Sequence, residues 1–319
     1  MMLLLSAVIC TRHRTTQLER ALHSLQAQRQ PASEILVIDN APQDDATARL
    51  IADRFPGVRY VREPRIGLDV ARNRALREAR HDLVAFLDDD AVAEAKWSMN
   101  IRQAFERDPA VAICTGRVEP LALDTDAQKL FEANGGFSRG MTRIRLPKDA
   151  GRPLHGRRAP LIAWAVSVGN GASFAVRRRT ILALGGFDEA LDRGETLPGG
   201  GDLDIFWRVL QAGHGLVYEP AVLAWHEHRR ELAEVARQLA GHQRAVTAFL
   251  LKSLKTGAGG QRLSVFAFLV WRLLKPGVRL VRRMAGRDPL PAWILRRMAA
   301  AAVGGLWAYP GTPEPVVPS

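Results

Sequence analysis

Short apolar runs alternate with segments of helical periodicity along the first 120 residues of the chain. Apolar and β-branched runs predict strands over residues 3–10, 34–39, 58–61 and 83–87. Between them, apolar residues recur every three or four positions and predict helices over residues 15–28, 44–55 and 70–79. Strands that alternate with helices of this length indicate βαβ units. The pattern therefore predicts an α/β fold with a Rossmann-like, mostly parallel central sheet flanked by helices.

The pattern is less regular in the middle of the chain. Further helices are expected over residues 97–107, 179–184 and 202–212, and further strands over residues 111–115, 163–176 and 217–225. Residues 121–160 are irregular and contain several glycines, which predicts a long loop that is either functional or mobile. Beyond residue 231 the chain is expected to be helical, with a proline-rich, disordered tail over residues 310–319.

The net charge of +12 is concentrated in the C-terminal part of the chain. From Arg229 onward there are 15 Lys and Arg against 4 Asp and Glu. These bases are interleaved with apolar residues, among them Val265, Phe266, Phe268, Leu269 and Trp271. A basic amphipathic helix is typical of segments that bind an anionic membrane surface, although a helical flap packed on the protein body is the alternative. No nucleic-acid-binding motif accompanies the charge, so nucleic acid is not an expected partner.

Composition and targeting signals indicate a folded protein of a reducing compartment. Cys10 and Cys114 both lie in apolar stretches and are expected to be buried thiols. The N-terminal stretch lacks a basic segment and is expected to form the first strand, not a signal peptide. No run reaches the roughly 18 apolar residues of a membrane span. We therefore expect a cytoplasmic protein, peripheral on the inner face of the cell membrane.

Three consecutive carboxylates, Asp88, Asp89 and Asp90, directly follow the apolar run at residues 83–87. Like charges at the end of a buried strand need a neutralising partner. A divalent metal that also binds a phosphate meets this need. Asp39 ends the second predicted strand, and in parallel sheets ligands bind beyond such strand ends. The alternative for the triplet is a solvated strand end that caps a helix.

Three other positions carry candidate chemistry. Arg72 lies near the start of a helix opened by a glycine turn, a place suited to a phosphate or a nucleotide. Asp202 follows three glycines at a helix start, where it is a candidate general base or only a helix cap. His226 follows an apolar strand and is either a metal ligand that completes a shell with Asp90 or a structural histidine.

The ordered set of segments resembles the family 2 glycosyltransferases, which have the GT-A fold. The resemblance covers roughly residues 3–230 and is carried by Thr11-Arg12, Asp39, Gly67–Asn73, Phe86–Asp90, Gly169–Arg178, Gly185–Glu189, Gly201–Gly213 and His226–Arg229. It implies a catalytic domain over residues 1–230, with a nucleotide-sugar half at 1–118 and an acceptor half at 119–230. A basic helical extension over residues 231–309 would follow.

The resemblance also implies a reaction and a set of roles. The enzyme would move a sugar from a nucleoside-diphosphate sugar to a hydroxyl of a lipid-linked or polysaccharide acceptor, with inversion, as in cell-envelope synthesis. Asp202 would be the general base, and Mg²⁺ or Mn²⁺ would be held by Asp88, Asp90 and His226. The donor would be bound by Thr11, Arg12, Asp39, Arg72, Asn73, Asp88, Asp89 and Asn170. The family usually has Glu-Asp before the acceptor-site helix, whereas this chain has Gly201-Asp202, so a different electrostatic setting is expected for Asp202.

Two other functions remain open from the sequence. The pattern Asp88-x-Asp90-x-Val92 also matches the nucleophile motif of haloacid-dehalogenase-type phosphohydrolases. That motif normally follows the first core strand, whereas three βα units precede it here. The third possibility is a non-catalytic binding module attached to membranes by its basic extension.

Overall fold

The computed structural model describes residues 3–154, 158–194, 196–257 and 259–310 of the chain. Its centre is a nine-stranded sheet in the order β3-β2-β1-β4-β8-β6-β9-β5, with β7 paired to β9. The strands are β1 (Leu5–Thr11), β2 (Glu34–Asn40), β3 (Arg59–Glu63), β4 (Leu83–Leu87), β5 (Ala91–Ala93), β6 (Val111–Pro120), β7 (Ile144–Leu146), β8 (Ser173–Arg177) and β9 (Gly215–His226).

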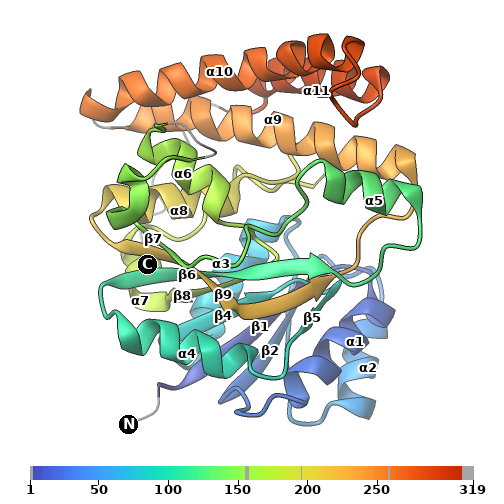
Figure 1. Ribbon diagram of the computed structural model, residues 1–319. Helices are drawn as coiled ribbons and strands as arrows, with labels where there is room; N and C mark the ends of the chain where they lie inside the picture. Colours follow the sequence, from blue (N-terminus) through green and yellow to red (C-terminus); the bar gives the residue numbers. More distant parts are fainter. Residues whose placement is uncertain (1–2, 155–157, 195, 258, 311–319) are drawn as a thin grey trace.

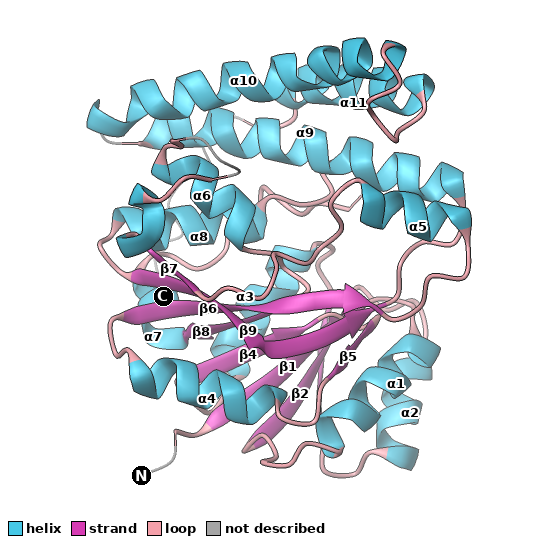
Figure 2. Cartoon of the chain, in the orientation of Figure 1, coloured by secondary structure: helices cyan, strands magenta, loops and turns pink. Residues whose placement is uncertain are grey.

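Helices cover both faces of this sheet, and a further helical layer lies above them (Figures 1 and 2). The helices of the body are α1 (Thr15–Gln26), α2 (Ala46–Arg54), α3 (Leu68–Glu78), α4 (Trp97–Arg107), α5 (Asp126–Ala133), α6 (Leu161–Val168), α7 (Arg178–Ala183) and α8 (Gly201–Gln211). The upper layer consists of α9 (Leu232–Thr256), α10 (Gly259–Met284) and α11 (Ala292–Gly304). This arrangement confirms the predicted α/β fold.

The N-terminal half of the sheet is parallel. β1 pairs in parallel with β2 and with β4, and β2 pairs in parallel with β3. Along β1, Val8 packs in one core cluster while Ala7 and Ile9 pack in the other, on opposite faces of the sheet. Burial on both faces explains why these strands are continuous apolar runs rather than alternating ones. Because the strands run the same way, their carboxyl ends meet at one edge, where Thr11 pairs with Asp39.

The strand direction changes next to β4. β8 is antiparallel to both β4 and β6, and β9 runs parallel to β6. The short β5 returns antiparallel against β9, with Ala91 opposite His226. This register places the end of β9 beside the acidic turn that follows β4.

Two predictions for the middle of the chain are wrong. The expected strand over residues 163–176 is in its first part the helix α6, and only Ser173–Arg177 is a strand. A short, wholly apolar run has no periodicity that separates a buried helix from a buried strand. The expected loop over residues 121–160 contains α5, which begins with a capping box between Thr125 and Gln128.

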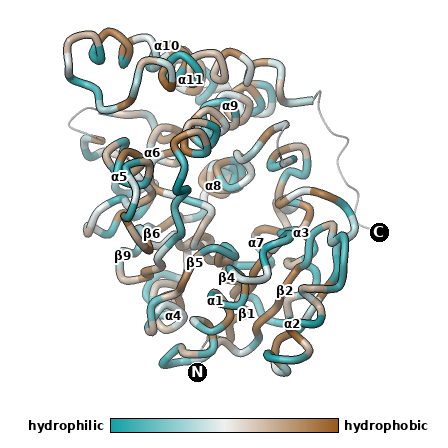
Figure 3. The backbone as a smooth tube through the Cα atoms, turned by 90° about the vertical axis from the view of Figure 1, so that its right-hand side faces the viewer, coloured by the Kyte–Doolittle hydropathy of each residue, from teal (hydrophilic) through white to brown (hydrophobic). Residues whose placement is uncertain are grey.

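The C-terminal helices pack on the α/β body that contains the sheet. Phe249 and Leu250 of α9 are fully buried in the same core cluster as Phe206 of α8. On α10, Val265 and Leu269 are also buried, so the expectation that these two side chains lie at a membrane interface is wrong. Hydrophilic and hydrophobic residues alternate along α10 and α11 in Figure 3. No helix in the described ranges is both long and apolar enough to span a membrane.

Candidate active site

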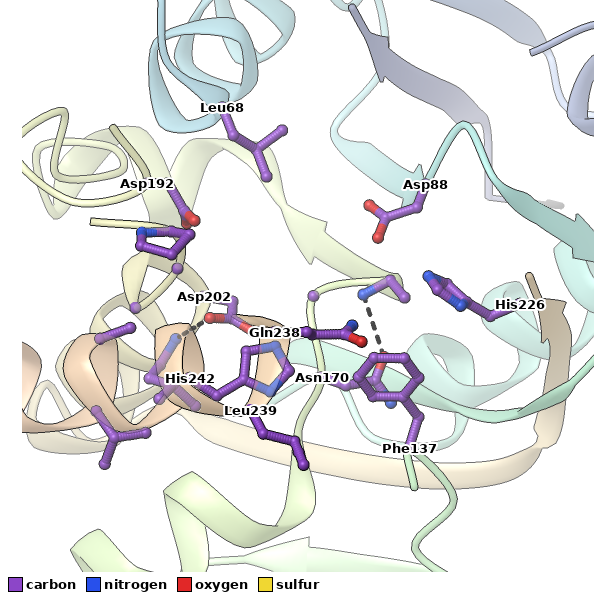
Figure 4. Close-up of a pocket in the computed structure, with 18 of the residues that line it drawn as sticks. Leu68, Asp88, Phe137, Asn170, Asp192, Asp202, His226, Gln238, Leu239 and His242 are labelled. Atoms are coloured by element: carbon purple, nitrogen blue, oxygen red, sulfur yellow. Dashed lines mark hydrogen bonds between the residues drawn. The ribbon is translucent and has the colours of Figure 1, made fainter. Parts of the chain in front are cut away.

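A cavity of about 990 Å³ lies between the carboxyl edge of the sheet and the C-terminal helices. The ends of β1, β4 and β9 line it on one side, and the segments before α3 and α8 line it on another. Residues of α9 and α10 close it from the top in the view of Figure 1. Figure 4 shows Asp88 and His226 on one side of this space and Asp202 and His242 on the other.

Asp88, Asp90 and His226 converge at the floor of the cavity. Each offers one ligand atom, and these atoms lie within 4.8 Å of one another. The His226 Nε2 is 3.1 Å from Asp90 Oδ1. The pairing of β5 with β9 brings them together, because the backbone N–H of Glu227 donates to the Asp90 carbonyl at 2.9 Å. Two carboxylates and an imidazole at this spacing fit a divalent ion such as Mg²⁺ or Mn²⁺.

The three groups differ in their ionisation. Burial and then the Asp90 charge raise the pKa of Asp88 to about 7. The neighbouring His226 and Arg14 hold the pKa of Asp90 well below its usual range despite its burial. In return, Asp90 raises the pKa of His226 against the opposing effect of burial. Asp88 is therefore the one of the three carboxylates that forms no ion pair with a described residue, whereas Arg14 pairs with Asp89 and Asp90.

Two further side chains hold His226 in place. They are His228, which follows β9, and Glu132 of α5, a helix that the sequence did not predict. The His226 Nδ1 lies 3.3 Å from His228 Nδ1, and His228 Nε2 lies 2.7 Å from Glu132 Oε1 on α5. Such outer contacts fix the orientation of an imidazole ligand. The ring of Phe137 packs on His226 with 5.0 Å between centroids.

Asp89 is satisfied by the protein itself. The Thr11 hydroxyl donates to Asp89 Oδ2 at 2.8 Å, and Arg14 Nη1 donates to Asp89 Oδ1 at 3.0 Å. Arg14 Nη1 also lies 2.9 Å from Asp90 Oδ2, so one guanidinium bridges two of the three carboxylates. Arg14 carries no local signature in the sequence that marks it as a site residue. Arg12 is exposed and lines the cavity.

Two predicted site residues do not line the cavity. Asp39 is buried at the end of β2, where the Tyr60 hydroxyl donates to its Oδ2 at 2.9 Å and burial raises its pKa. Its Oδ1 has no hydrogen-bond partner in the described part of the chain. Asn73 donates to the Phe187 carbonyl at 2.9 Å and accepts from the Phe187 N–H at 2.8 Å. Asn73 thus attaches α3 to the segment that precedes α8.

Asp202 lies in the first turn of α8 and lines the opposite side of the cavity. Its Oδ1 accepts from the Leu203 N–H at 2.9 Å. Its Oδ2 lies near Arg72, since a Cβ on Gly171 would be 3.0 Å from Asp202 Oδ2 and 2.9 Å from Arg72 Nη2. The preceding turn depends on Gly200, which has a φ of +101°.

Arg72 is buried among carboxylates. Its Nη1 lies 3.0 Å from Asp69 Oδ1 and 3.2 Å from Asp192 Oδ2. Burial raises the pKa of Asp192 to about 6, and burial together with Asp192 raises the pKa of Asp69 well above its usual value. The resemblance expected a glutamate at position 201, and here Asp69 of α3 supplies a carboxylate beside that position. Only the tertiary fold reveals Asp69 and Asp192 as members of this cluster.

Asn170 is buried and lines the cavity between the two carboxylate groups. Its Oδ1 accepts from the Ala172 N–H at 3.2 Å. Its Nδ2 is buried without a hydrogen-bond partner among the described residues. A buried donor of this kind is normally satisfied, so Asn170 is available to a ligand oxygen.

Comparison with known proteins agrees with this geometry. The family model described as "Glycosyl transferase family 2" matches residues 6–179. The pre-mycofactocin glycosyltransferase of Mycobacterium tuberculosis is 28% identical over 330 residues, which cover 95% of this chain and 62% of that protein. The O-antigen chain rhamnosyltransferase WbaN of Salmonella anatum is 29% identical over 209 residues, which cover 65% of this chain and 60% of that protein. The chain thus spans less than two thirds of the length of these relatives.

Among solved structures, a mannosyltransferase from Pyrobaculum calidifontis, solved with GDP-Man and Mn²⁺, has a similar fold. Its TM-score is 0.62 at 16% identity, and the match covers 95% of this chain and 87% of that one. The structure of GalNAc-T7 with UDP, GalNAc and Mn²⁺ matches with a TM-score of 0.54 at 17% identity, over 81% of this chain and 52% of that one. With a family match over more than half of its length and the GT-A fold around the acidic turn, the chain belongs to glycosyl transferase family 2.

Proposed function

We propose that this glycosyltransferase moves a sugar from a nucleoside-diphosphate sugar to a hydroxyl of a lipid-linked or polysaccharide acceptor and inverts the anomeric configuration. The observation that carries the proposal is the presence of two separate groups of carboxylates in one cavity. Asp88 and Asp90 lie with His226 on one side, and Asp202 lies on the other. One side suits a metal-bound diphosphate, and the other suits a hydroxyl that must lose a proton.

We assign a Mg²⁺ or Mn²⁺ ion to Asp88, Asp90 and His226. The raised pKa of Asp88 supports this assignment, because Asp88 lies buried beside the Asp90 charge and forms no ion pair with a described residue. When bound, the ion would act as a Lewis acid that stabilises negative charge on the departing diphosphate. Arg14 holds Asp89 and Asp90 in place, and His228 orients the imidazole.

We assign the proton transfer to Asp202. Its Oδ1 is occupied by the Leu203 N–H, so Oδ2 is the atom that takes the acceptor proton. The acceptor oxygen then attacks the anomeric carbon from the face opposite the diphosphate, and this attack inverts the configuration. A positioned general base contributes about 10²–10⁴-fold to the rate.

We further propose that residues at the carboxyl edge of the sheet bind the donor: Thr11, Arg12, Asp39, Arg72, Asn73, Asp88, Asp89 and Asn170. The Nδ2 of Asn170 lines the cavity without a hydrogen-bond partner among the described residues, which supports a direct contact. Asp39 lies outside the cavity lining, so its contribution would be to hold the end of β2. Arg72 and Asn73 are both engaged with protein groups, so their contribution is to hold α3 and the segment before α8 in position.

Turnover of a nucleoside-diphosphate-sugar panel, measured as release of nucleoside diphosphate with lipid and glycan acceptors, tests the role of Asp202. Asp202→Asn should lower the rate at least about 100-fold while nucleotide binding is retained. Asp126→Asn is the matched control, because Asp126 is a fully exposed first-turn residue of α5 and should leave the rate unchanged. Wild-type turnover by Asp202→Asn would exclude Asp202 as the base.

We also propose that α10 lies on an anionic membrane surface. Its outer side exposes large apolar residues at helical spacing, namely Leu263, Phe266, Val270, Trp271, Leu274, Val278, Val281 and Met284. Exposed bases of the same helix, Arg262, Arg282 and Arg283, accompany this stripe. Apolar side chains flanked by bases match the boundary between acyl chains and anionic headgroups. Such a position would bring a lipid-linked acceptor to the cavity below.

A further inference from the structure

The inner side of α10 carries cations that line the cavity. Arg272, Lys275 and Arg279 recur at spacings of three and four residues and therefore lie on one side of the helix. All three are half-buried. Neighbouring like charges on one helix face repel each other. Such a row on a cavity wall creates a positive potential that attracts an anion.

Only one of the three forms an ion pair within the described residues. Arg279 binds Asp288 through two contacts of 2.7 Å and also donates to Asn134 Oδ1 at 2.7 Å. Arg272 donates to Gln243 Oε1 at 2.9 Å, and its buried Nε has no partner in the described part of the chain. Lys275 forms no ion pair with any described residue.

A third uncompensated cation faces the same space from another element. Arg139, which follows α5, lines the cavity and donates to the backbone carbonyls of Gly136 and Ser138 at 3.2 and 3.0 Å. It forms no ion pair within the ranges that the structure describes. Three cations from two distant segments thus line one cavity, and none of the three forms an ion pair with a described residue. Because unpaired buried charge is costly, the arrangement fits a bound anion.

The electrostatic effects are those of charges withdrawn from water. Burial lowers the pKa of Arg272 to about 10. Burial, and then the charges of Arg272 and Arg279, lower the pKa of Lys275 to about 8. Burial lowers the pKa of His242. The charge of Asp202 opposes this shift, whereas the charges of Arg139 and Arg272 add to it. His242 therefore lies within electrostatic reach of both the proposed base and the cations.

This relationship separates the cations from the proposed metal site. Neither Arg272 nor Lys275 is among the principal charges that act on Asp88 or Asp90. Arg272 donates instead to Gln243 Oε1 at 2.9 Å on α9, and Gln243 follows His242, which lies beside Asp202 in Figure 4. An anion bound to the cations would therefore belong to the acceptor side of the cavity.

We propose that Arg139, Arg272 and Lys275 bind a phosphate or diphosphate group of the acceptor and so place its hydroxyl at Asp202. The inference rests on the function proposed above and adds to it the chemical class of the acceptor. The proposal also gives α10 two roles. Its outer side would contact the lipid, and its inner side would bind the phosphate that joins the acceptor to that lipid. Arginine and lysine donors are well suited to phosphate oxygens.

Calorimetric titration of inorganic pyrophosphate into the full-length, metal-free protein tests the proposed site. The double variant Arg272→Gln/Lys275→Gln should bind pyrophosphate at least about tenfold more weakly than the wild type. Arg296→Gln/Arg297→Gln is the matched control, because it removes the same charge from exposed positions of the neighbouring helix α11 and should bind like the wild type. Equal affinity of the two double variants, or no binding by the wild type, would overturn the proposal.

A second titration separates the acceptor from the donor as the source of the phosphate. Binding of UDP and GDP in the presence of Mn²⁺ should be the same in Arg272→Gln/Lys275→Gln as in the wild type. A tenfold loss would assign the cations to the donor diphosphate and overturn the acceptor assignment. Absence of nucleotide binding in the wild type would instead contradict the proposed function itself.

Thermal unfolding keeps the test independent of folding defects. Because Arg272→Gln/Lys275→Gln removes two cations without an ion-pair partner among the described residues, its unfolding temperature in the absence of metal should equal or exceed that of the wild type. Pyrophosphate should raise the midpoint of the wild type and of the control variant but not that of Arg272→Gln/Lys275→Gln. An equal rise in all three proteins would place the anion elsewhere and contradict the proposal.

Discussion

The carboxylate of Asp69 occupies the space that a side chain at Gly201 would need. A Cβ on Gly201 would lie 1.7 Å from Asp69 Oδ2 and 2.4 Å from Asp69 Cγ. Gly201 does not have a left-handed backbone conformation. A glycine is needed here because Asp69 approaches the backbone closely, and not because of an unusual turn. The carboxylate beside the proposed base thus comes from α3, and the sequence at position 201 has adapted to it.

Gly201→Ala should therefore destabilise the protein. Overpacking of this kind costs typically about 1–3 kcal/mol, because Asp69 must leave Arg72 or α8 must shift. Equilibrium unfolding in urea measures the change. Gly304→Ala is the control, since a Cβ there meets no atom within 4 Å.

A double-mutant cycle decides whether Asp69 is the cause. With Asp69→Gly in the background, Gly201→Ala should lose most of its penalty, because the obstructing carboxylate is gone. The same penalty in both backgrounds would show that the two residues do not compete for this space.

Lys252 joins the C-terminal helices to the catalytic body. Its Nζ lies 2.5 Å from Asp188 and 2.7 Å from Asp204, and all three side chains are at most 10% exposed. Lys252→Met should cost about 3–5 kcal/mol of unfolding free energy, because it leaves the buried Asp188 without its cation and Asp204 with Arg208 alone. Chemical denaturation measures this. Lys255→Met, an exposed neighbour on α9, should change stability little, and equal effects of both variants would contradict the assigned pairing.

Metal affinity should depend on pH through Asp88. Because the metal-free pKa of Asp88 is about 7, a proton competes with the ion below that pH. The apparent Mn²⁺ affinity should fall roughly tenfold between pH 7.5 and pH 6, and the raised pKa of His226 adds to the fall. Titration of Mn²⁺ at several pH values measures this. An affinity that stays constant across this interval would show that Asp88 is not a ligand.

The same shift predicts how the metal-free protein responds to pH. A carboxyl whose pKa is higher in the folded than in the unfolded state favours folding when protonated. Ionisation of Asp88 should therefore lower stability as the pH rises from about 4 to about 7. Asp88→Asn should flatten this part of the profile of unfolding midpoint against pH. An unchanged slope would mean that other groups cause it.

The outer side of α10 should carry the membrane affinity. Phe266 and Leu274 are 53% and 59% exposed, and replacing both by Ser removes apolar surface worth about 1.5–3 kcal/mol for each side chain that becomes fully buried. In sedimentation with phosphatidylglycerol vesicles, Phe266→Ser/Leu274→Ser should bind at least about tenfold more weakly than the wild type. Leu4→Ser is the control, because Leu4 is 53% exposed near the N-terminus, at the opposite end of the molecule from α10 in Figure 1. Equal binding of both proteins would contradict a membrane-facing α10.

The sequence was most informative where structure is local and periodic. The strands β1, β2 and β4 were predicted because burial on both faces makes them continuous apolar runs. The acidic turn after β4 was predicted because its three carboxylates are adjacent in the chain. The helix α6 was missed because an apolar run of eight residues is compatible with either secondary structure.

The rest of the site depends on contacts between distant segments. His226 meets Asp90 only through the register of β5 with β9, and the sequence could suggest but not establish that pairing. Arg14, Asp69 and Asp192 carry no local signature, and each acquires its role from the element opposite it. The cationic inner side of α10 was visible as a basic segment, but its direction is fixed by packing on α9.

Calorimetric titration of a panel of nucleoside-diphosphate sugars, with and without Mn²⁺, tests the central claim most directly. We expect at least one UDP- or GDP-sugar to bind only when Mn²⁺ is present, and Asp88→Asn to abolish that dependence while Asp126→Asn retains it. Metal-independent binding of every donor, or binding of none, would contradict the assignment of Asp88, Asp90 and His226 to a metal-assisted donor site.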